Sequence, residues 1–222
     1  MIKFNINKLS KVFIIAEIGV NHEGSLAKCK KLIKLAAKAG ANAVKIQTVN
    51  EEESYIKSTQ AYKAFKKKNF SDKQLIEIKK YSKKNEILFF STPGDFNSLE
   101  RLKKLGTPIV KISSGLMNHY PLIKKAAKMN VPLIISTGMA NKKDLVELKR
   151  FLIEIKFNKY AILKCTSEYP AKVENLNLKS LSDLKMIFPG TVGYSDHTIG
   201  TIAPVVAVSL GAKIIEKHIT LN

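Results

Sequence analysis

Eight short apolar runs recur along the chain, and helix-like segments separate them. The runs are apolar at successive positions, which is typical of strands buried on both faces of a parallel sheet. They lie at Val12–Ile18, Ala43–Thr48, Ile87–Ser91, Pro108–Ile112, Pro132–Ile135 and Tyr160–Lys164, and in the two runs that end at Asp196-His197 and Glu216-Lys217-His218. Eight such units predict an α/β fold, a (β/α)8 TIM barrel, in preference to an open sheet.

We expect the whole chain to form one barrel domain. A length of 222 residues and a hydrophobic content of 45% suit one domain with one large core. Because the eighth run lies close to Asn222, we expect a barrel domain over residues 1–222 that is truncated after the eighth strand and lacks its last outer helix. Without that helix, outward-facing residues of the first and last strands would lose cover: Phe13 and Ile15 or their neighbours, and Ile214 or Ile215.

Local signals place some boundaries between these units. Ser25 is expected to cap the first helix, and Ser71-Asp72 to open another one. The segment Asn50–Phe70 is polar, rich in lysine and long for a connection between a strand and a helix. We expect a long loop there, and long loops in compact domains are often functional.

The net charge of +20 narrows the choice of partners. Lysines are spread through every helix-like segment and only Arg101 and Arg150 are arginine, which disfavours nucleic-acid binding and favours an anionic small substrate. No apolar run is long enough to span a membrane, and Met1–Val12 lacks a signal-peptide core. With Cys29 in a helix-like run and Cys165 in a strand-like run, we predict a reduced, cytoplasmic protein.

Polar residues gather where the predicted strands end, the edge at which active sites of barrels lie. Strand ends are polar in part because loops begin there. That reason does not extend to charged residues inside apolar runs, since burying a charge is costly unless it is paired. The candidate residues are Glu17, Lys45, Gln47, Thr92, Lys111, Ser114, Ser136, Thr166, Asp196, His197, Glu216 and His218.

His197 and His218 end two neighbouring predicted strands. Imidazoles that converge at one sheet edge are suited to a divalent metal such as manganese, cobalt or zinc, and less to calcium. The alternative is two core histidines with satisfied hydrogen bonds. His22 could be part of a site or a solvated loop residue, and His119 is expected to be structural or exposed.

Two turns predict an anion site. Ser113-Ser114-Gly115 and Ser136-Thr137-Gly138 follow predicted strands, where hydroxyl and backbone N–H groups are placed to bind an anion. Lys45 and Lys111 would supply the opposite charge. Phosphate and carboxylate both fit this description.

At this point the residues resemble the sialic acid synthase (N-acetylneuraminate synthase) family. The matching motifs run in order along nearly the whole chain. They are Ile-Ala-Glu-Ile-Gly-Val-Asn-His-Glu-Gly (15–24), Val-Lys-Ile-Gln-Thr (44–48), Ser-Thr-Pro (91–93), Lys-Ile-Ser-Ser-Gly (111–115), Ser-Thr-Gly-Met (136–139), Cys-Thr-Ser-Glu-Tyr-Pro (165–170), Gly-Tyr-Ser-Asp-His-Thr (193–198) and Glu-Lys-His-Ile-Thr-Leu (216–221).

The resemblance implies an enzyme that condenses phosphoenolpyruvate with an N-acetylated hexosamine, such as N-acetylmannosamine, and releases phosphate. It implies that His197 and His218 hold a divalent metal, manganese first and magnesium or cobalt as alternatives, and that Glu17 is a catalytic carboxylate. It implies a homodimer. The residues expected to bind substrate are Lys45, Gln47, Thr92, Lys111, Ser114, Ser136, Thr166, Tyr169 and Ser195.

The chain also departs from the family pattern. Gly94 stands where the family usually has Phe, and Leu116 where it usually has Glu. We expect the family's C-terminal antifreeze-like domain to be absent. An alternative function is therefore a catalytically impaired remnant that only binds phosphate or metal.

Overall fold

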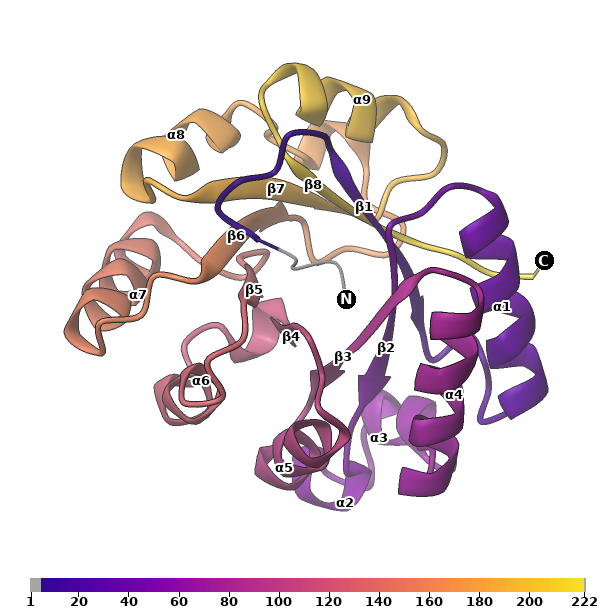
Figure 1. Ribbon diagram of the computed structural model, residues 1–222. Helices are drawn as coiled ribbons and strands as arrows, with labels where there is room; N and C mark the ends of the chain where they lie inside the picture. The colour runs from indigo at the N-terminus through magenta and orange to yellow at the C-terminus, as the bar shows by residue number, and fades with distance from the viewer. Residues whose placement is uncertain (1–4, 222) are drawn as a thin grey trace. The chain divides into compact units, whose positions relative to one another are not determined.

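The computed structural model describes residues 5–221, so the ends of the predicted domain at residues 1–4 and 222 lie outside the described residues. Its parallel strands follow one another in the order β1-β2-β3-β4-β5-β6-β7-β8, the order of a closed barrel (Figure 1). This is the predicted (β/α)8 fold. The strands are β1 Phe13–Gly19, β2 Ala43–Thr48, β3 Leu88–Pro93, β4 Val110–Ile112, β5 Leu133–Ser136, β6 Tyr160–Cys165, β7 Thr191–Asp196 and β8 Ile214–His218.

Helices separate these strands along the chain, and two 3-10 turns follow β4 and β6. The helices are α1 Leu26–Lys38, α2 Glu51–Ser54, α3 Gln60–Phe65, α4 Asp72–Lys84, α5 Phe96–Leu105, α6 Tyr120–Ala127, α7 Lys142–Glu154, α8 Ser180–Ile187 and α9 Ile202–Ser209, and the 3-10 turns are η1 Ser114–Leu116 and η2 Val173–Asn175. Among the described residues, no helix is long and apolar enough to cross a membrane.

The chain divides into two compact units. The first unit holds Ile15–Val110 with the residues from His218 onward, and the second holds the residues up to Ile14 with Lys111–Lys217. In the first unit β2 lies between β1 and β3. In the second unit β5, β6, β7 and β8 pair in sequence order, with Asp196 opposite Lys217.

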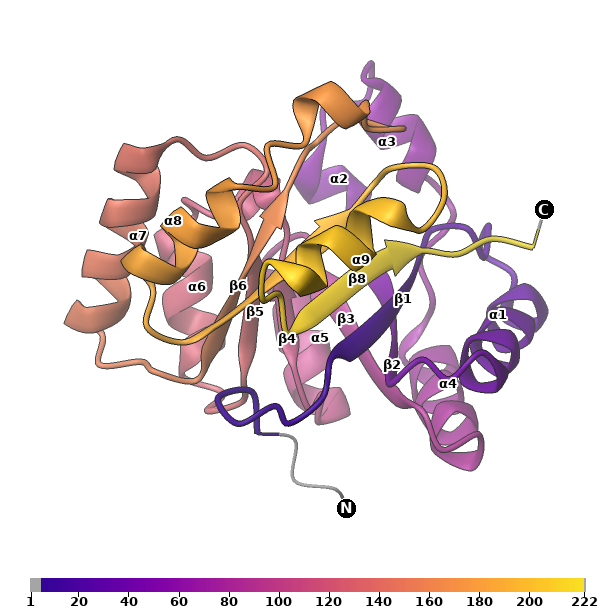
Figure 2. The ribbon, with the colours of Figure 1, turned by 90° about the horizontal axis from the view of Figure 1, so that it is seen from above.

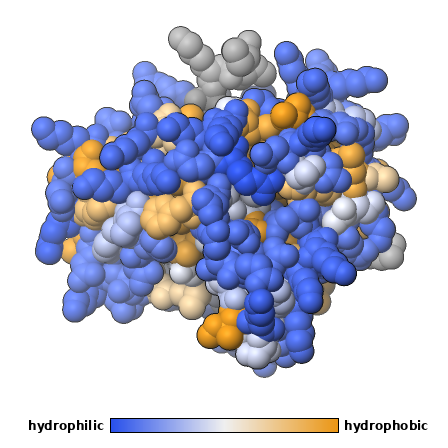
Figure 3. Space-filling model, turned by 90° about the horizontal axis from the view of Figure 1, so that it is seen from below, coloured by the Kyte–Doolittle hydropathy of each residue, from blue (hydrophilic) through white to orange (hydrophobic). Residues whose placement is uncertain are grey.

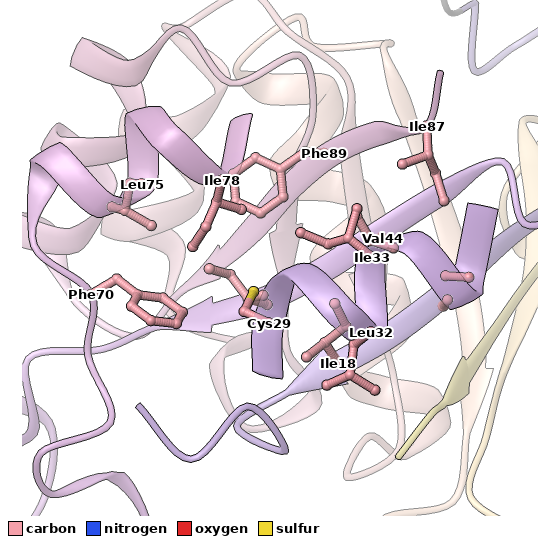
Figure 4. Close-up of a cluster of buried hydrophobic side chains, with 13 residues drawn as sticks. Ile18, Cys29, Leu32, Ile33, Val44, Phe70, Leu75, Ile78, Ile87 and Phe89 are labelled. Atoms are coloured by element: carbon pink, nitrogen blue, oxygen red, sulfur yellow. The ribbon is translucent and has the colours of Figure 1, made fainter. Parts of the chain in front are cut away.

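The core of the first unit forms between α1, α4 and strands β1 to β3 (Figure 4). The inner stripe of α1 buries Cys29, Leu32 and Ile33, as the helical spacing of the apolar residues requires. The predicted cap is confirmed, because the Ser25 side chain accepts a hydrogen bond from the Lys28 N–H. Ser71 likewise begins α4, in a capping box with Gln74.

The prediction of a continuous loop over Asn50–Phe70 is wrong, since α2 and α3 lie within it. Each helix starts at a residue suited to capping: Asn50 accepts from the Glu52 N–H and Thr59 from the Tyr62 N–H. The Asn50 N–H also donates to the Asp95 carboxylate at 2.7 Å, which ties this segment to the start of α5.

In the second unit α9 covers β7 and β8. Its inner face carries small residues, and Ala203 and Ala207 pack with Ile215 and Tyr194 in one buried cluster. Figure 2 shows α9 running along β8.

The predicted uncovering is wrong for the last strand, and on the first strand it holds for Ile14, a neighbour of the named residues. Ile15, Ile214 and Ile215 are buried, while the neighbouring Ile14 is 44% exposed. Successive strand side chains point to opposite faces, so Ile15 shares the face of Glu17, and Ile14 points the other way. Ile215 is covered by the small residues of α9.

The surface is largely hydrophilic, as expected for lysines spread along the whole chain. On the face shown in Figure 3 hydrophilic residues predominate, and the apolar residues form small, separated patches.

Candidate active site

In the first unit, Glu17 and Lys45 form an ion pair at the ends of neighbouring strands. Lys45 Nζ lies 2.8 Å from Glu17 Oε2, and only 2–3% of either side chain is exposed. Lys45 also donates to Thr92 Oγ1 at 3.0 Å, and Gln47 donates to Glu17 Oε1 at 3.2 Å. Four of the predicted site residues thus form one connected group. A buried charge pair with extra hydrogen bonds meets the condition under which buried charges are tolerated.

A backbone irregularity shapes the end of β1. The register with β2 shifts between Glu17 and Gly19, as at a β-bulge, and Gly19 has a φ of +55°. A Cβ on Gly19 would lie 3.3 Å from Glu17 Oε1 and 3.5 Å from His218 Cε1. Glycine at this position therefore allows the Glu17 carboxylate and the half-buried His218 ring to approach the same backbone.

In the second unit, Lys111 lies at the centre of another buried polar group. Its Nζ donates to Ser136 Oγ at 2.7 Å and lies 3.4 Å from Glu216 Oε1. Glu216 Oε1 also accepts from Ser195 Oγ at 3.0 Å. The predicted residues Lys111, Ser136 and Ser195 are brought together. Glu216 links them; it was a candidate at a strand end but was not among the residues expected to bind substrate.

The two predicted anion-binding turns also meet. The Gly138 N–H donates to Ser114 Oγ at 2.9 Å. A Cβ on Gly138 would lie 2.5 Å from Ser167 Oγ and 3.1 Å from Cys165 Sγ, so glycine alone permits this approach. Burial raises the pKa of the Cys165 thiol, which therefore stays protonated near neutral pH.

His197 follows β7 and is held by the segment after β6. Its Nδ1 lies 2.7 Å from the Thr166 carbonyl oxygen, and its ring stacks on Tyr169 at a centroid distance of 4.0 Å. A carbonyl only accepts, so the neutral ring carries its proton on Nδ1 and its lone pair on Nε2. Thr166 thus contacts His197 through its backbone, and Tyr169, 68% exposed, contacts it with its ring.

Asp196 precedes His197 and is buried in a network that sequence reasoning missed. It accepts from Tyr194 Oη at 3.1 Å, from the Thr198 N–H at 3.0 Å and from Lys217 Nζ at 2.5 Å. Burial, with the nearby Asp196 charge, raises the pKa of Tyr194, so this phenol remains a donor. The sequence signal for this ion pair was that Asp196 directly precedes His197 and Lys217 directly precedes His218.

The donor chemistry of His197 fits a metal ligand. Metal-bound histidines commonly donate their other ring N–H to a backbone carbonyl or carboxylate, as Nδ1 does to Thr166. Within residues 5–221, no group of three or more His, Cys, Asp or Glu side chains could hold a metal ion. A metal bound by His197 and His218 would then need oxygen ligands from water or substrate.

His22 and His119 each accept a hydrogen bond from a backbone N–H. His22 is fully buried against Phe70, and its Nδ1 accepts from the Gly24 N–H at 3.0 Å, so the solvated-loop interpretation is wrong. Burial, with a smaller effect of Lys68, lowers the pKa of His22 to about 4. His119 caps α6 by accepting from the Leu122 N–H, as the structural interpretation predicts.

The substitution at Gly94 has a steric explanation. A Cβ there would lie 2.8 Å from both methyl groups of Val49. Val49 thus fills the space in which a side chain at position 94 would begin.

These features define the class: a (β/α)8-barrel protein with buried lysine–carboxylate pairs and clustered hydroxyls where its strands end. The model of the NeuB family matches residues 32–222, and the chain belongs to this family.

The relatives cover nearly all of this chain. It is 42% identical to an uncharacterised protein of Methanocaldococcus jannaschii, over 98% of this chain and 64% of that protein. It is 41% identical to the N,N'-diacetyllegionaminic acid synthase of Campylobacter jejuni, over 96% of this chain and 69% of that enzyme. The chain thus spans about two thirds of the length of these relatives.

A solved structure supports the same fold. The N-acetylneuraminic acid (sialic acid) synthetase of Leptospira borgpetersenii, crystallised with citrate, aligns with a TM-score of 0.95 and 36% identity. The alignment covers 100% of this chain and 78% of that one.

Proposed function

We propose that this chain carries the catalytic barrel of a nonulosonic (sialic) acid synthase. The reaction joins phosphoenolpyruvate to the aldehyde of an N-acetylated hexosamine such as N-acetylmannosamine, takes up water and releases phosphate. The relatives named as sialic, legionaminic and pseudaminic acid synthases support this class of reaction. The observation that carries it is the buried group of Lys111, Ser136 and Ser195.

In this proposal lysines and hydroxyls that the sequence places at strand ends bind phosphoenolpyruvate. The proposed donors are Lys45, Thr92, Lys111, Ser114, Ser136 and Ser195, and the Ser195 hydroxyl now donates to Glu216. Charge-assisted hydrogen bonds to phosphate and carboxylate are strong when water is excluded. Because Glu17 and Glu216 already neutralise these lysines, a bound anion has to share or replace a carboxylate as the lysine's partner.

We propose His197 and His218 as ligands of a divalent metal, manganese first and magnesium or cobalt as alternatives. When bound, such an ion supplies Lewis-acid polarisation of the sugar aldehyde. The chain's part is to hold the ring of His197 with its Nδ1 proton on Thr166, so that Nε2 is the coordinating nitrogen.

The proposed reaction joins the two substrates before phosphate leaves. The enol carbon of phosphoenolpyruvate forms a bond to the aldehyde carbon, and the aldehyde oxygen gains a proton. Water adds to the resulting oxocarbenium ion, and the tetrahedral intermediate loses phosphate. In this proposal Glu17, held by Lys45 and Gln47, stabilises the positive charge or takes the proton of the water.

Phosphate release tests this function. The full chain is incubated with manganese, phosphoenolpyruvate and, in separate reactions, N-acetylmannosamine, its 6-phosphate and a 2,4-diacetamido sugar. Release that depends on one sugar supports the synthase and names the acceptor.

Tight phosphoenolpyruvate or manganese binding without release in any reaction would favour the alternative, a protein that only binds phosphate or metal. The homodimer and the cytoplasmic location remain predictions, which sedimentation and cell fractionation test.

A further inference from the structure

The residue after each candidate metal ligand has both of its backbone polar groups hydrogen-bonded. After His197, the Thr198 N–H donates to Asp196 Oδ1 at 3.0 Å, and the Thr198 carbonyl accepts from Lys217 Nζ at 2.8 Å. After His218, the Ile219 N–H donates to the Glu17 carbonyl at 2.9 Å, and the Ile219 carbonyl accepts from Asn21 Nδ2 at 2.8 Å. The first arrangement lies in the second unit and the other in the first unit.

The arrangement around His197 is built on an ion pair between strands. Asp196 and Lys217 lie opposite each other in the β7–β8 register, and Lys217 Nζ lies 2.5 Å from Asp196 Oδ2. The Asp196 side chain is inaccessible to water, and that of Lys217 is 27% exposed. The two paired side chains therefore hold the backbone next to His197, because Asp196 accepts from the Thr198 N–H and Lys217 donates to the Thr198 carbonyl.

The ring of His197 is fixed separately by the segment after β6. Thr166 accepts its Nδ1 proton and Tyr169 stacks against it. With backbone and ring both held, the direction of Nε2 is set before any ligand arrives. Sites held in this way avoid the ordering cost of binding.

We propose that Lys217 and Asn21 are positioning residues for metal binding, Lys217 through His197 and Asn21 through His218. This inference rests on the proposed metal ligands and adds residues that do not contact the metal. Partners that orient metal ligands typically contribute 10–100-fold to affinity.

The test compares five variants of the full chain. Lys217→Met removes the ion pair, Lys217→Arg retains the charge, and Asn21→Ala removes an exposed side chain that holds Ile219. Lys213→Met alters an exposed lysine just before β8 and serves as the matched control, and His197→Ala removes the proposed ligand. The measurements are Mn2+ binding by electron paramagnetic resonance and 15N spectra of histidine rings in the metal-free chain.

Lys217→Met is expected to weaken Mn2+ binding 10–100-fold and to shift the His197 ring away from the Nδ1-protonated form. Lys217→Arg should retain most of the affinity. Asn21→Ala should weaken Mn2+ binding while leaving the His197 ring signal unchanged, and Lys213→Met should change neither readout.

Unchanged ring signals and unchanged affinity in folded Lys217→Met would overturn the role of Lys217. Circular dichroism checks that Lys217→Met is folded. If it is not, Asn21→Ala tests the inference, because Mn2+ affinity equal to that of the parent chain in Asn21→Ala would overturn it. Parental Mn2+ binding by His197→Ala would instead overturn the proposed ligand, and the ring spectra would still test whether Lys217 orients His197.

Discussion

Lys45 Nζ lies 2.8 Å from Glu17 Oε2, and water reaches almost nothing of either side chain. The pair connects the ends of β1 and β2, where Glu17 and Lys45 lie opposite each other in the register. Each charge is tolerated in the interior only because the other is present. Losing either partner therefore leaves the other charge buried and uncompensated.

Removing one partner should cost more stability than removing both. Lys45→Met leaves Glu17 buried without its cation and should lower the free energy of unfolding by about 3–5 kcal/mol. The double variant Glu17→Gln, Lys45→Met should recover part of this loss. Urea denaturation measures both values. The control is Lys30→Met, which breaks a surface pair with Glu77 and should cost no more than about 1 kcal/mol. Equal losses in Lys45→Met and Lys30→Met would contradict the prediction.

The anion site should depend on Lys111. Lys111→Met is expected to weaken phosphoenolpyruvate binding by about 2–5 kcal/mol, since a buried, charge-assisted contact is lost. Titration calorimetry measures the affinity, and circular dichroism checks the fold. Lys103→Met, on the exposed side of α5, is the matched control. If Lys111→Met binds as tightly as the parent chain, Lys111 does not hold the anion.

The metal proposal predicts a difference between histidines. His197→Ala and His218→Ala should each abolish Mn2+ binding, while the barrel stays folded. His119→Ala removes the cap of α6 and should affect stability without affecting Mn2+ affinity. Retained Mn2+ binding in both His197→Ala and His218→Ala would refute the assignment.

His22 should make stability depend on pH. Its pKa is lowered to about 4 in the folded chain from the ordinary 6.5, so the unfolded state binds more protons between these values. Stability is then complete above pH 6.5 and falls as the pH drops towards 4. From pH 7 to pH 5 the loss should be about 2 kcal/mol. His22→Gln should remove this slope in denaturation series at the two pH values, and an identical slope in parent and variant would exclude His22 as its source.

The sequence by itself determined the barrel and the ends of its strands. Short runs that are mostly apolar at successive positions are typical of strands covered on both faces, and Ser25 and Ser71 mark helix starts through local hydrogen bonds. The sequence also indicated the polar site residues at strand ends, because a charge such as Lys111 inside an apolar run is buried and needs a partner. The motifs that resemble the synthase family can also be read from the sequence, because each is a short continuous stretch.

The tertiary structure decided which partner each of these residues has. Lys111 pairs with Glu216 on a strand distant in sequence and Asp196 with Lys217 on the next strand, and no local pattern encodes those contacts. The same is true of burial: Ile14 and Ile15 are identical side chains, and the direction each takes from β1 leaves the first exposed and the second buried. Register and twist of the whole sheet set these outcomes, because a shift of one residue would send every side chain of a strand to its other face.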